Sequence, residues 1–145
     1  MIYLTEAALA LRIASGDLDV LTDAYDRDVL LNGAELDAIN EVTSYLAIKY
    51  DTDQIFNIEQ PESDKSATIN RIVADIAIYN LSNLINSRNI PESRINLRDD
   101  AIKWLSAIAD PRGNITAPFL PPREYADKSK GDISWGGRPK NKNYY

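Results

Sequence analysis

The amino-acid sequence predicts an all-α fold, a small bundle of four to five helices followed by an extended C-terminal arm. First, apolar residues recur between Thr68 and Asn86 at the i, i+3, i+4, i+7 spacing of a helix face. Second, no strand-like alternation of convincing length and no internal repeat occurs. Third, prolines and glycines replace helical periodicity after Gly113. We therefore expect a helical domain over residues 1–112 and the arm over residues 113–145.

The composition narrows the classes of function. The 145 residues suffice for about one domain, and 22 acids against 16 bases give a net charge of −6, which does not favour general nucleic-acid binding. The absence of cysteine and histidine excludes disulfides, thiolate metal sites and the commonest general base. No apolar run approaches the roughly 18–20 residues that cross a bilayer, and the N-terminus lacks signal-peptide features, so we expect no membrane association.

Two short helices are expected at the N-terminus. Thr5 is a good N-cap for a helix that ends at Ser15-Gly16, with Leu9 and Ile13 on its buried side. Asp17 can cap a second helix over residues 18–23.

The sequence Asp26-Arg27-Asp28 places carboxylates at alternate positions, which is the start of a calcium-binding loop. The sixth position of such a loop is Leu31 rather than glycine, and the twelfth is not glutamate. We therefore interpret the segment as a polar connector.

A longer helix is expected from Ala34 to Tyr50, after a turn at Asn32-Gly33. The expected buried face consists of Leu36, Ile39, Val42 or Thr43, Leu46 and Tyr50, and the expected polar face of Glu35, Asn40, Glu41 and Ser44. Residues 51–66 then form a long polar loop with an apolar anchor over residues 55–58. We expect this anchor, which includes Phe56, to contact the core or a neighbouring subunit.

The stretch from Thr68 to Asn86 is apolar over more than half of its circumference, so other helices must cover it on several sides. Asp75 lies four residues after Arg71, where the two can pair on one helix face. A tyrosine hydroxyl is the alternative partner for Asp75, and a perturbed functional carboxylate is the less favoured interpretation.

The last helix is expected from Leu97 to Ala109, after a break at residues 87–90. Its expected buried face consists of Ala101, Trp104, Leu105 and Ile108. Asp99 and Asp100 resemble a carboxylate pair of a glycosidase, but their place near a helix start is explained by the helix dipole. No phosphate-binding loop, serine nucleophile motif or metal-ligand spacing is present. We therefore expect no catalytic, metal or cofactor site and no enzymatic activity.

The arm differs from the body in charge and in aromatic content. Residues 123–145 carry six bases and three acids, a net charge of +3, which leaves −9 for residues 1–122. The arm is too poor in apolar residues to fold alone, yet it has anchors of the types that dominate binding hot spots. By residue type, the partner-binding candidates are Phe56, Phe119, Tyr125, Trp135, Arg138, Lys140, Tyr144 and Tyr145.

Four segments, taken in order, carry a family resemblance. They are Tyr3-Leu4-Thr5-Glu6, Leu21-Thr22, residues 72–81 (Ile-Val-Ala-Asp-Ile-Ala-Ile-Tyr-Asn-Leu) and residues 98–105 (Arg-Asp-Asp-Ala-Ile-Lys-Trp-Leu). Together they resemble the phage Mu Gp36-like family over about residues 2–110. The long loop 51–66 and the long arm depart from the shorter members.

The resemblance implies a head–tail connector, or adaptor, of a tailed bacteriophage. Such a virion protein is made in the host cytoplasm and takes part in viral tail assembly. It forms a homo-oligomeric ring in the neck, commonly a dodecamer, between the portal protein and a downstream neck or tail protein. DNA passes through the ring without sequence-specific binding, and a C-terminal extension docks on the portal. An acidic body suits this role, since a basic lumen would grip the phosphates.

The resemblance also suggests that a neighbouring subunit covers part of the apolar surface around Ile78, Tyr79 and Ile85. Alternative functions are another neck component (a stopper or tail-completion protein) and a small helical DNA-binding regulator. A regulator requires a recognition helix on a basic surface, and the acidic body argues against it.

Overall fold

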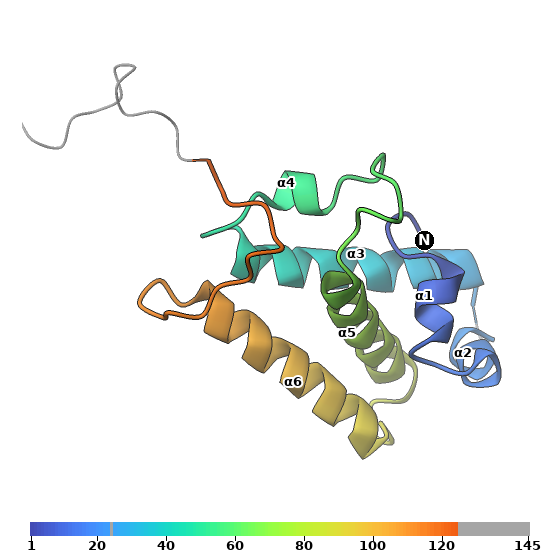
Figure 1. Ribbon diagram of the computed structural model, residues 1–145. Coiled ribbons are helices and arrows are strands. Elements are labelled where there is room, and N and C mark those ends of the chain that lie inside the picture. The colour runs from blue at the N-terminus through green and yellow to red at the C-terminus, as the bar shows by residue number, and fades with distance from the viewer. Residues whose placement is uncertain (24, 125–145) are drawn as a thin grey trace, which may run out of the picture.

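The computed structural model describes residues 1–23 and 25–124. Over these residues the chain forms α-helices and no β-strand. One isolated β-bridge pairs Tyr50 with Pro122. This arrangement confirms the expected all-α class (Figure 1). The helices are α1 (Glu6–Ala10), α2 (Ser15–Thr22), α3 (Arg27–Leu46), α4 (Thr52–Ile55), α5 (Ala67–Asn86) and α6 (Glu92–Ala109).

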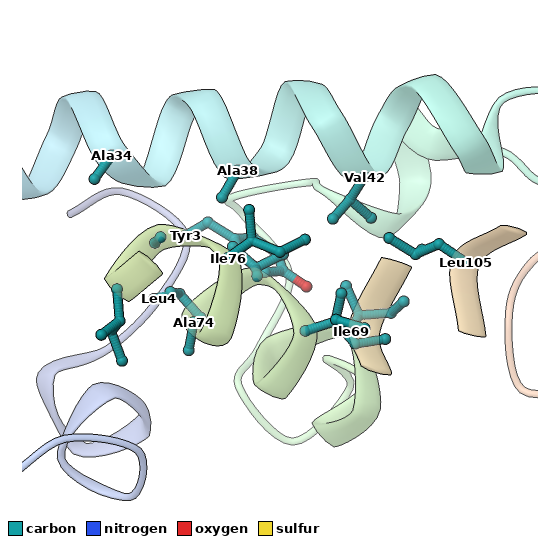
Figure 2. Close-up of a cluster of buried hydrophobic side chains, with 14 of the residues drawn as sticks. Tyr3, Leu4, Ala34, Ala38, Val42, Ile69, Ala74, Ile76 and Leu105 are labelled. Atoms are coloured by element: carbon teal, nitrogen blue, oxygen red, sulfur yellow. The ribbon is translucent and has the colours of Figure 1, made fainter. Parts of the chain in front are cut away.

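The core lies where α3, α5 and α6 pack against one another, while α1 and α2 cover the other side of α5 (Figure 1). In Figure 2, Ala38 and Val42 of α3 lie close to Ile76 of α5, and Leu105 of α6 lies at the edge of the same cluster. Every residue from Ile72 to Ile78 is buried. The middle of α5 is therefore enclosed on all sides, as its apolar circumference predicts.

Side-chain caps set the starts of α1, α3, α4 and α5, the α4 cap being Asp51, whose carboxylate accepts a hydrogen bond from Gln54 N. The Thr5 hydroxyl accepts a hydrogen bond from Ala8 N at 3.1 Å, which confirms this predicted cap, and Ser66 accepts one from Ile69 N. The Asp26 carboxylate accepts hydrogen bonds from the backbone at the start of α3, so the Asp-Arg-Asp segment is a helix cap. The predicted cap Asp17 is wrong, because α2 already begins at Ser15 and Asp17 lies inside its first turn.

The expected turn at Asn32-Gly33 is wrong, because α3 continues through it. A helical glycine costs about 1 kcal/mol relative to alanine. Leu31 and Ala34 on either side are buried against the core, and their packing offsets that cost. The rotational phase of α3 also differs from the expected one: Leu36 is 59% exposed and Glu35 is only 2% exposed.

Three expectations about α5 and α6 are also corrected. Arg71 is exposed, and Asp75 pairs instead with Arg12 of the segment after α1. Ile78 is buried in this chain's own core, so the expectation that a neighbouring subunit covers it is wrong. Helix α6 begins at Glu92, which places Asp99 more than one turn inside the helix, beyond the reach of the N-terminal dipole.

The first part of the predicted arm lies against the C-terminal end of α3. Ala117 and Leu120 are buried, and Ala117 N donates a hydrogen bond to the Tyr50 hydroxyl at 2.8 Å. Arg123 N donates to Lys49 O at 2.9 Å, and its side chain donates to Ala47 O at 2.8 Å. These contacts tie the chain to the body as far as Arg123. The docking of the arm on partner subunits stays a prediction.

Candidate assembly surface

Large apolar side chains are exposed on several helices. Single exposed apolar residues are normal on any protein surface, whereas those that share a groove indicate an interaction site. The more exposed ones are Ile2, Leu11, Val20, Tyr25, Val29, Leu36, Ile48, Ile58, Leu84, Ile85, Ile95, Ile115 and Phe119.

Two of these residues, Val29 and Leu84, line a groove between the first half of α3 and the last turns of α5. We call it the α3–α5 groove; it has a volume of about 430 Å³. Its lining residues are Val29, Leu30, Gly33, Ala34, Asp37, Asn80, Leu81, Asn83 and Leu84. Val29 is 58% exposed and Leu84 is 70% exposed, so both present apolar surface to solvent.

Two local features leave this groove open to solvent. Gly33 has no side chain, and a Cβ built there would meet nothing within 4 Å, so the α3 side is hollow at that position. On α5, every residue from Asn83 to Asn86 is exposed, since no described element covers this turn. The groove contains one acid, Asp37, and no lysine or arginine. It therefore combines an apolar floor with a weakly negative rim.

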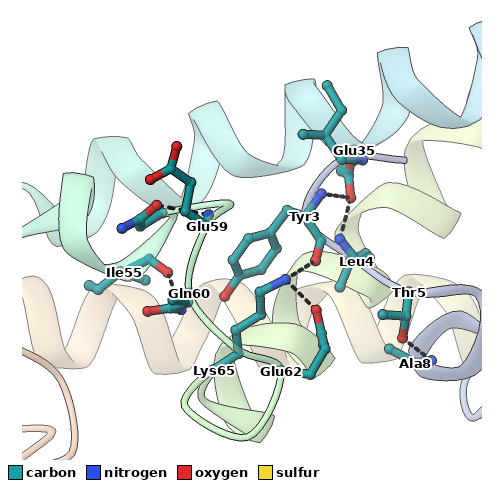
Figure 3. A network of polar contacts seen from close by, with 12 residues as sticks. Tyr3, Leu4, Thr5, Ala8, Glu35, Ile55, Glu59, Gln60, Glu62 and Lys65 are labelled. Atoms are coloured by element: carbon teal, nitrogen blue, oxygen red, sulfur yellow. Dashed lines mark hydrogen bonds and ion pairs between the residues drawn. The ribbon is translucent and has the colours of Figure 1, made fainter.

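A buried carboxylate holds the N-terminal segment on α3 (Figure 3). Glu35 Oε1 accepts hydrogen bonds from Tyr3 N at 3.0 Å and Leu4 N at 2.5 Å, and Oε2 accepts one from Ile2 N at 2.6 Å. Three backbone donors around one carboxylate stabilise its charge, and no base of residues 1–23 or 25–124 forms an ion pair with it. Glu35 is therefore a structural anchor.

Lys65 also contacts the N-terminal segment, at Tyr3. Its ammonium donates to Tyr3 O at 2.7 Å, pairs with Glu62 and lies 4.7 Å from the centroid of the Tyr3 ring (Figure 3). Burial, with the charges of Glu62 and Glu35, raises the pKa of the Tyr3 hydroxyl to about 12. That hydroxyl is buried without a hydrogen-bond partner among the described residues.

A second polar network joins the segment after α1 to α5 and α6. Arg12 Nε and Nη2 donate to the two oxygens of Asp75 at 2.8 and 2.7 Å, a bidentate ion pair whose carboxylate side chain is 3% exposed. Arg94 Nη1 donates to Arg12 O at 2.7 Å. Asp75 is thereby neutralised in place, which favours a structural role over a catalytic one.

Two of the candidate partner-binding residues lie within the described range. Phe56 is half-buried, and its ring packs edge-to-face on Tyr3 with centroids 5.2 Å apart. Phe119 is 53% exposed and stacks over Trp104, which is only half-buried although the sequence predicts it on the buried face. The structure does not bring Phe56 and Phe119 together in one ring contact. Tyr125, Trp135, Arg138, Lys140, Tyr144 and Tyr145 lie outside the described residues.

The sequence pattern does not mark Val29 and Leu84 as surface residues. Asn32-Gly33 predicts a turn, and a helix that begins after that turn does not include Val29. Leu84 matches the apolar spacing of α5, so periodicity alone predicts that it is buried. One available signal is the 29, 33, 36 spacing, which places Val29, Gly33 and Leu36 on one face of a longer helix.

The described residues contain no group of three or more acidic, histidine or cysteine side chains that could hold a metal ion. In the same range, no helix is long and apolar enough to cross a membrane. The described part of the chain is therefore a small all-α protein that presents an open apolar groove, the type of surface found at protein interfaces. The body to which it belongs has a net charge of −9.

The chain belongs to the family described as Bacteriophage Mu, Gp36, which matches residues 3–130. It is a bacteriophage protein, and the family resemblance of its four sequence segments is confirmed. A search of curated proteins and a search of solved structures return no match.

Proposed function

We propose that this chain is a head-to-tail connector, an adaptor subunit that forms a ring below the portal. DNA passes through the ring, which commonly has twelve subunits, and the ring joins the portal to the next neck or tail protein. The C-terminal arm contacts the portal or neighbouring subunits. The observation that carries the proposal is an exposed apolar groove on the helical body of a chain that belongs to a phage family.

The charge distribution supports this role. The body carries −9, and its exposed acids include Asp53, Asp99 and Asp100. An acidic ring wall repels the phosphate backbone and lets DNA slide, whereas a basic wall would bind it with a strong salt dependence. The arm, with its net charge of +3, suits a protein partner of opposite charge.

In vitro joining tests the proposal directly. Phage particles made without this chain should accumulate as DNA-filled heads and free tails, and addition of the purified full-length chain should restore joined particles, counted by electron microscopy. A DNA-binding regulator would change gene expression and restore nothing when added to finished heads. Heads that join tails without the chain would overturn the proposal.

Portal binding separates an adaptor from a stopper or tail-completion protein. An adaptor should co-sediment with isolated portal rings, because it contacts the portal directly. A stopper should co-sediment only when another neck protein is also present. Binding that requires a third protein would therefore indicate a stopper or tail-completion protein in the lower part of the neck.

A further inference from the structure

The α3–α5 groove and the last described residues lie at opposite ends of α3. The groove uses Val29 to Asp37, near the start of the helix, whereas Arg123 is bonded to Ala47 and Lys49, just after its end. At a rise of 1.5 Å per residue, Ala47 lies ten positions after Asp37, which separates the two sites by roughly 15 Å along the helix axis. A donor and an acceptor on different surfaces of one chain generate a head-to-tail contact, which is the type of contact that closes a ring.

The composition of the remaining chain fits the groove. Residues 125–145 carry five bases and two acids, and they contain Ile133 and Trp135 followed by Gly136-Gly137 and Arg138. An indole matches an apolar floor, and glycines allow the backbone to approach closely. The groove presents Asp37 and two asparagines and no base, so an arginine beside the indole meets complementary charge. Its volume of about 430 Å³ lies within the range of sites that hold a small ligand or one large side chain.

The occupant has sufficient reach. Trp135 lies eleven positions after Glu124, and an extended chain covers about 3.3–3.6 Å per position. The span of roughly 35–40 Å exceeds the length of α3, a helix of 20 residues and thus about 30 Å, so reach permits docking in a groove at that distance on the same body or on a neighbouring copy.

We propose that Trp135 of one copy docks in the α3–α5 groove of the next copy, with Arg138 of that arm beside Asp37. The inference deepens the proposed connector function, since it assigns the subunit contact of the ring, and it rests on that function. It makes the arm of each subunit the link to its neighbour and leaves the rest of the body free to contact the portal.

Tryptophan fluorescence tests the proposal on the full-length chain. The chain has two tryptophans, so Trp104→Phe leaves Trp135 as the only indole while keeping an aromatic ring beside Phe119. We expect a blue shift of Trp135 emission that grows with protein concentration, because the indole enters a groove of another molecule. A shift that does not depend on concentration would mean that the arm binds its own body, and it would overturn the proposal, as would no shift at all.

A groove variant and a matched control locate the contact. Leu84→Asp places a charge in the groove and should raise the concentration needed for the shift at least tenfold. Leu11→Asp makes the same change just after α1, at a site that is 83% exposed and outside the groove lining, and should leave the shift unchanged. Thermal unfolding of both variants checks that the fold is intact. An equal effect of the two variants, or no effect of Leu84→Asp, would contradict docking in the groove.

Cross-linking gives a readout that does not depend on fluorescence. Because the chain has no cysteine, Asn83→Cys and Ser134→Cys can each be introduced as the single thiol of a separate isotope-labelled protein. A short thiol cross-linker should join 83 to 134 between molecules more than it joins 106 to 134 in a control that uses Ser106→Cys, an exposed position on α6. Equal yields would overturn the proposal. If docking fails while the chain still restores head–tail joining, only this inference is lost; docking without joining removes the connector function instead.

Discussion

The middle and the end of α5 differ in how the rest of the chain covers them. Every residue from Ile72 to Ile78 is buried, because α3, α6 and α1 surround these two turns. Every residue from Asn83 to Asn86 is exposed, and Leu84 lines the open α3–α5 groove. Both parts have apolar residues at helical spacing. The difference shows that the same pattern supplies a core in one place and surface available to a partner in another.

The largest effect should come from a cavity in the enclosed part. Ile76 is 0% exposed, so Ile76→Ala should lower the free energy of unfolding by about 4 kcal/mol through lost burial and a cavity. Leu84→Ala is the matched control and should change it by less than about 0.5 kcal/mol. Thermal or urea unfolding of both variants measures the difference. Similar losses would mean that the end of α5 is covered as well as its middle.

A smaller effect is expected from the ion pair that joins the segment after α1 to the enclosed part of α5. Arg12→Ala leaves the buried Asp75 carboxylate without its partner and should cost about 3 kcal/mol of stability. Arg71→Ala removes the arginine that the sequence predicts as the partner, and its exposed position predicts a change within about 0.5 kcal/mol. Chemical denaturation of the two variants side by side decides which arginine neutralises Asp75.

The phase of α3 can be tested at two adjacent positions. Glu35→Ala removes the acceptor for three backbone donors and should cost about 2 kcal/mol, with faster amide hydrogen exchange at Tyr3 and Leu4. Leu36→Ala should leave stability nearly unchanged, since Leu36 is 59% exposed. The reverse order of effects would place Leu36 in the core, as the sequence pattern alone predicts.

The smallest effect at neutral pH concerns the Tyr3 hydroxyl. Because the pKa is raised to about 12 in the folded chain from 10.0, the folded state holds this proton more tightly than the unfolded state. Stability from this group is therefore complete below pH 10 and falls as the pH rises from about 10 to about 12. Tyr3→Phe should be nearly neutral at pH 7, because it removes an unpartnered hydroxyl, and should flatten the alkaline loss. Unfolding curves at pH 7 and pH 11 measure both effects, and an unchanged alkaline slope in the variant would assign that slope to another group.

Local chemistry explains which features were predictable. Thr5 is a helix cap in both sequence and structure, because a hydroxyl before a run of helix formers satisfies the first free N–H groups wherever the helix packs. The core role of α5 was predictable for a similar reason, since its apolar residues cover most of its circumference. The groove could not be predicted, because it depends on α3 continuing through Asn32-Gly33 and on α5 extending beyond its cover.

The sequence by itself determined the all-α class, the central place of α5 and the charge contrast between body and arm, all of which follow from periodicity and composition. Tertiary structure decided that Glu35 faces inward and Leu36 outward, that Arg12 rather than Arg71 neutralises Asp75, and that the end of α5 stays open. The physical reason is that each of these outcomes depends on which contact between segments far apart in the sequence is the more favourable. Backbone N–H groups of the N-terminal segment stabilise the buried Glu35, and Arg12 binds Asp75, which lies 63 residues away in the sequence. No local pattern contains those partners.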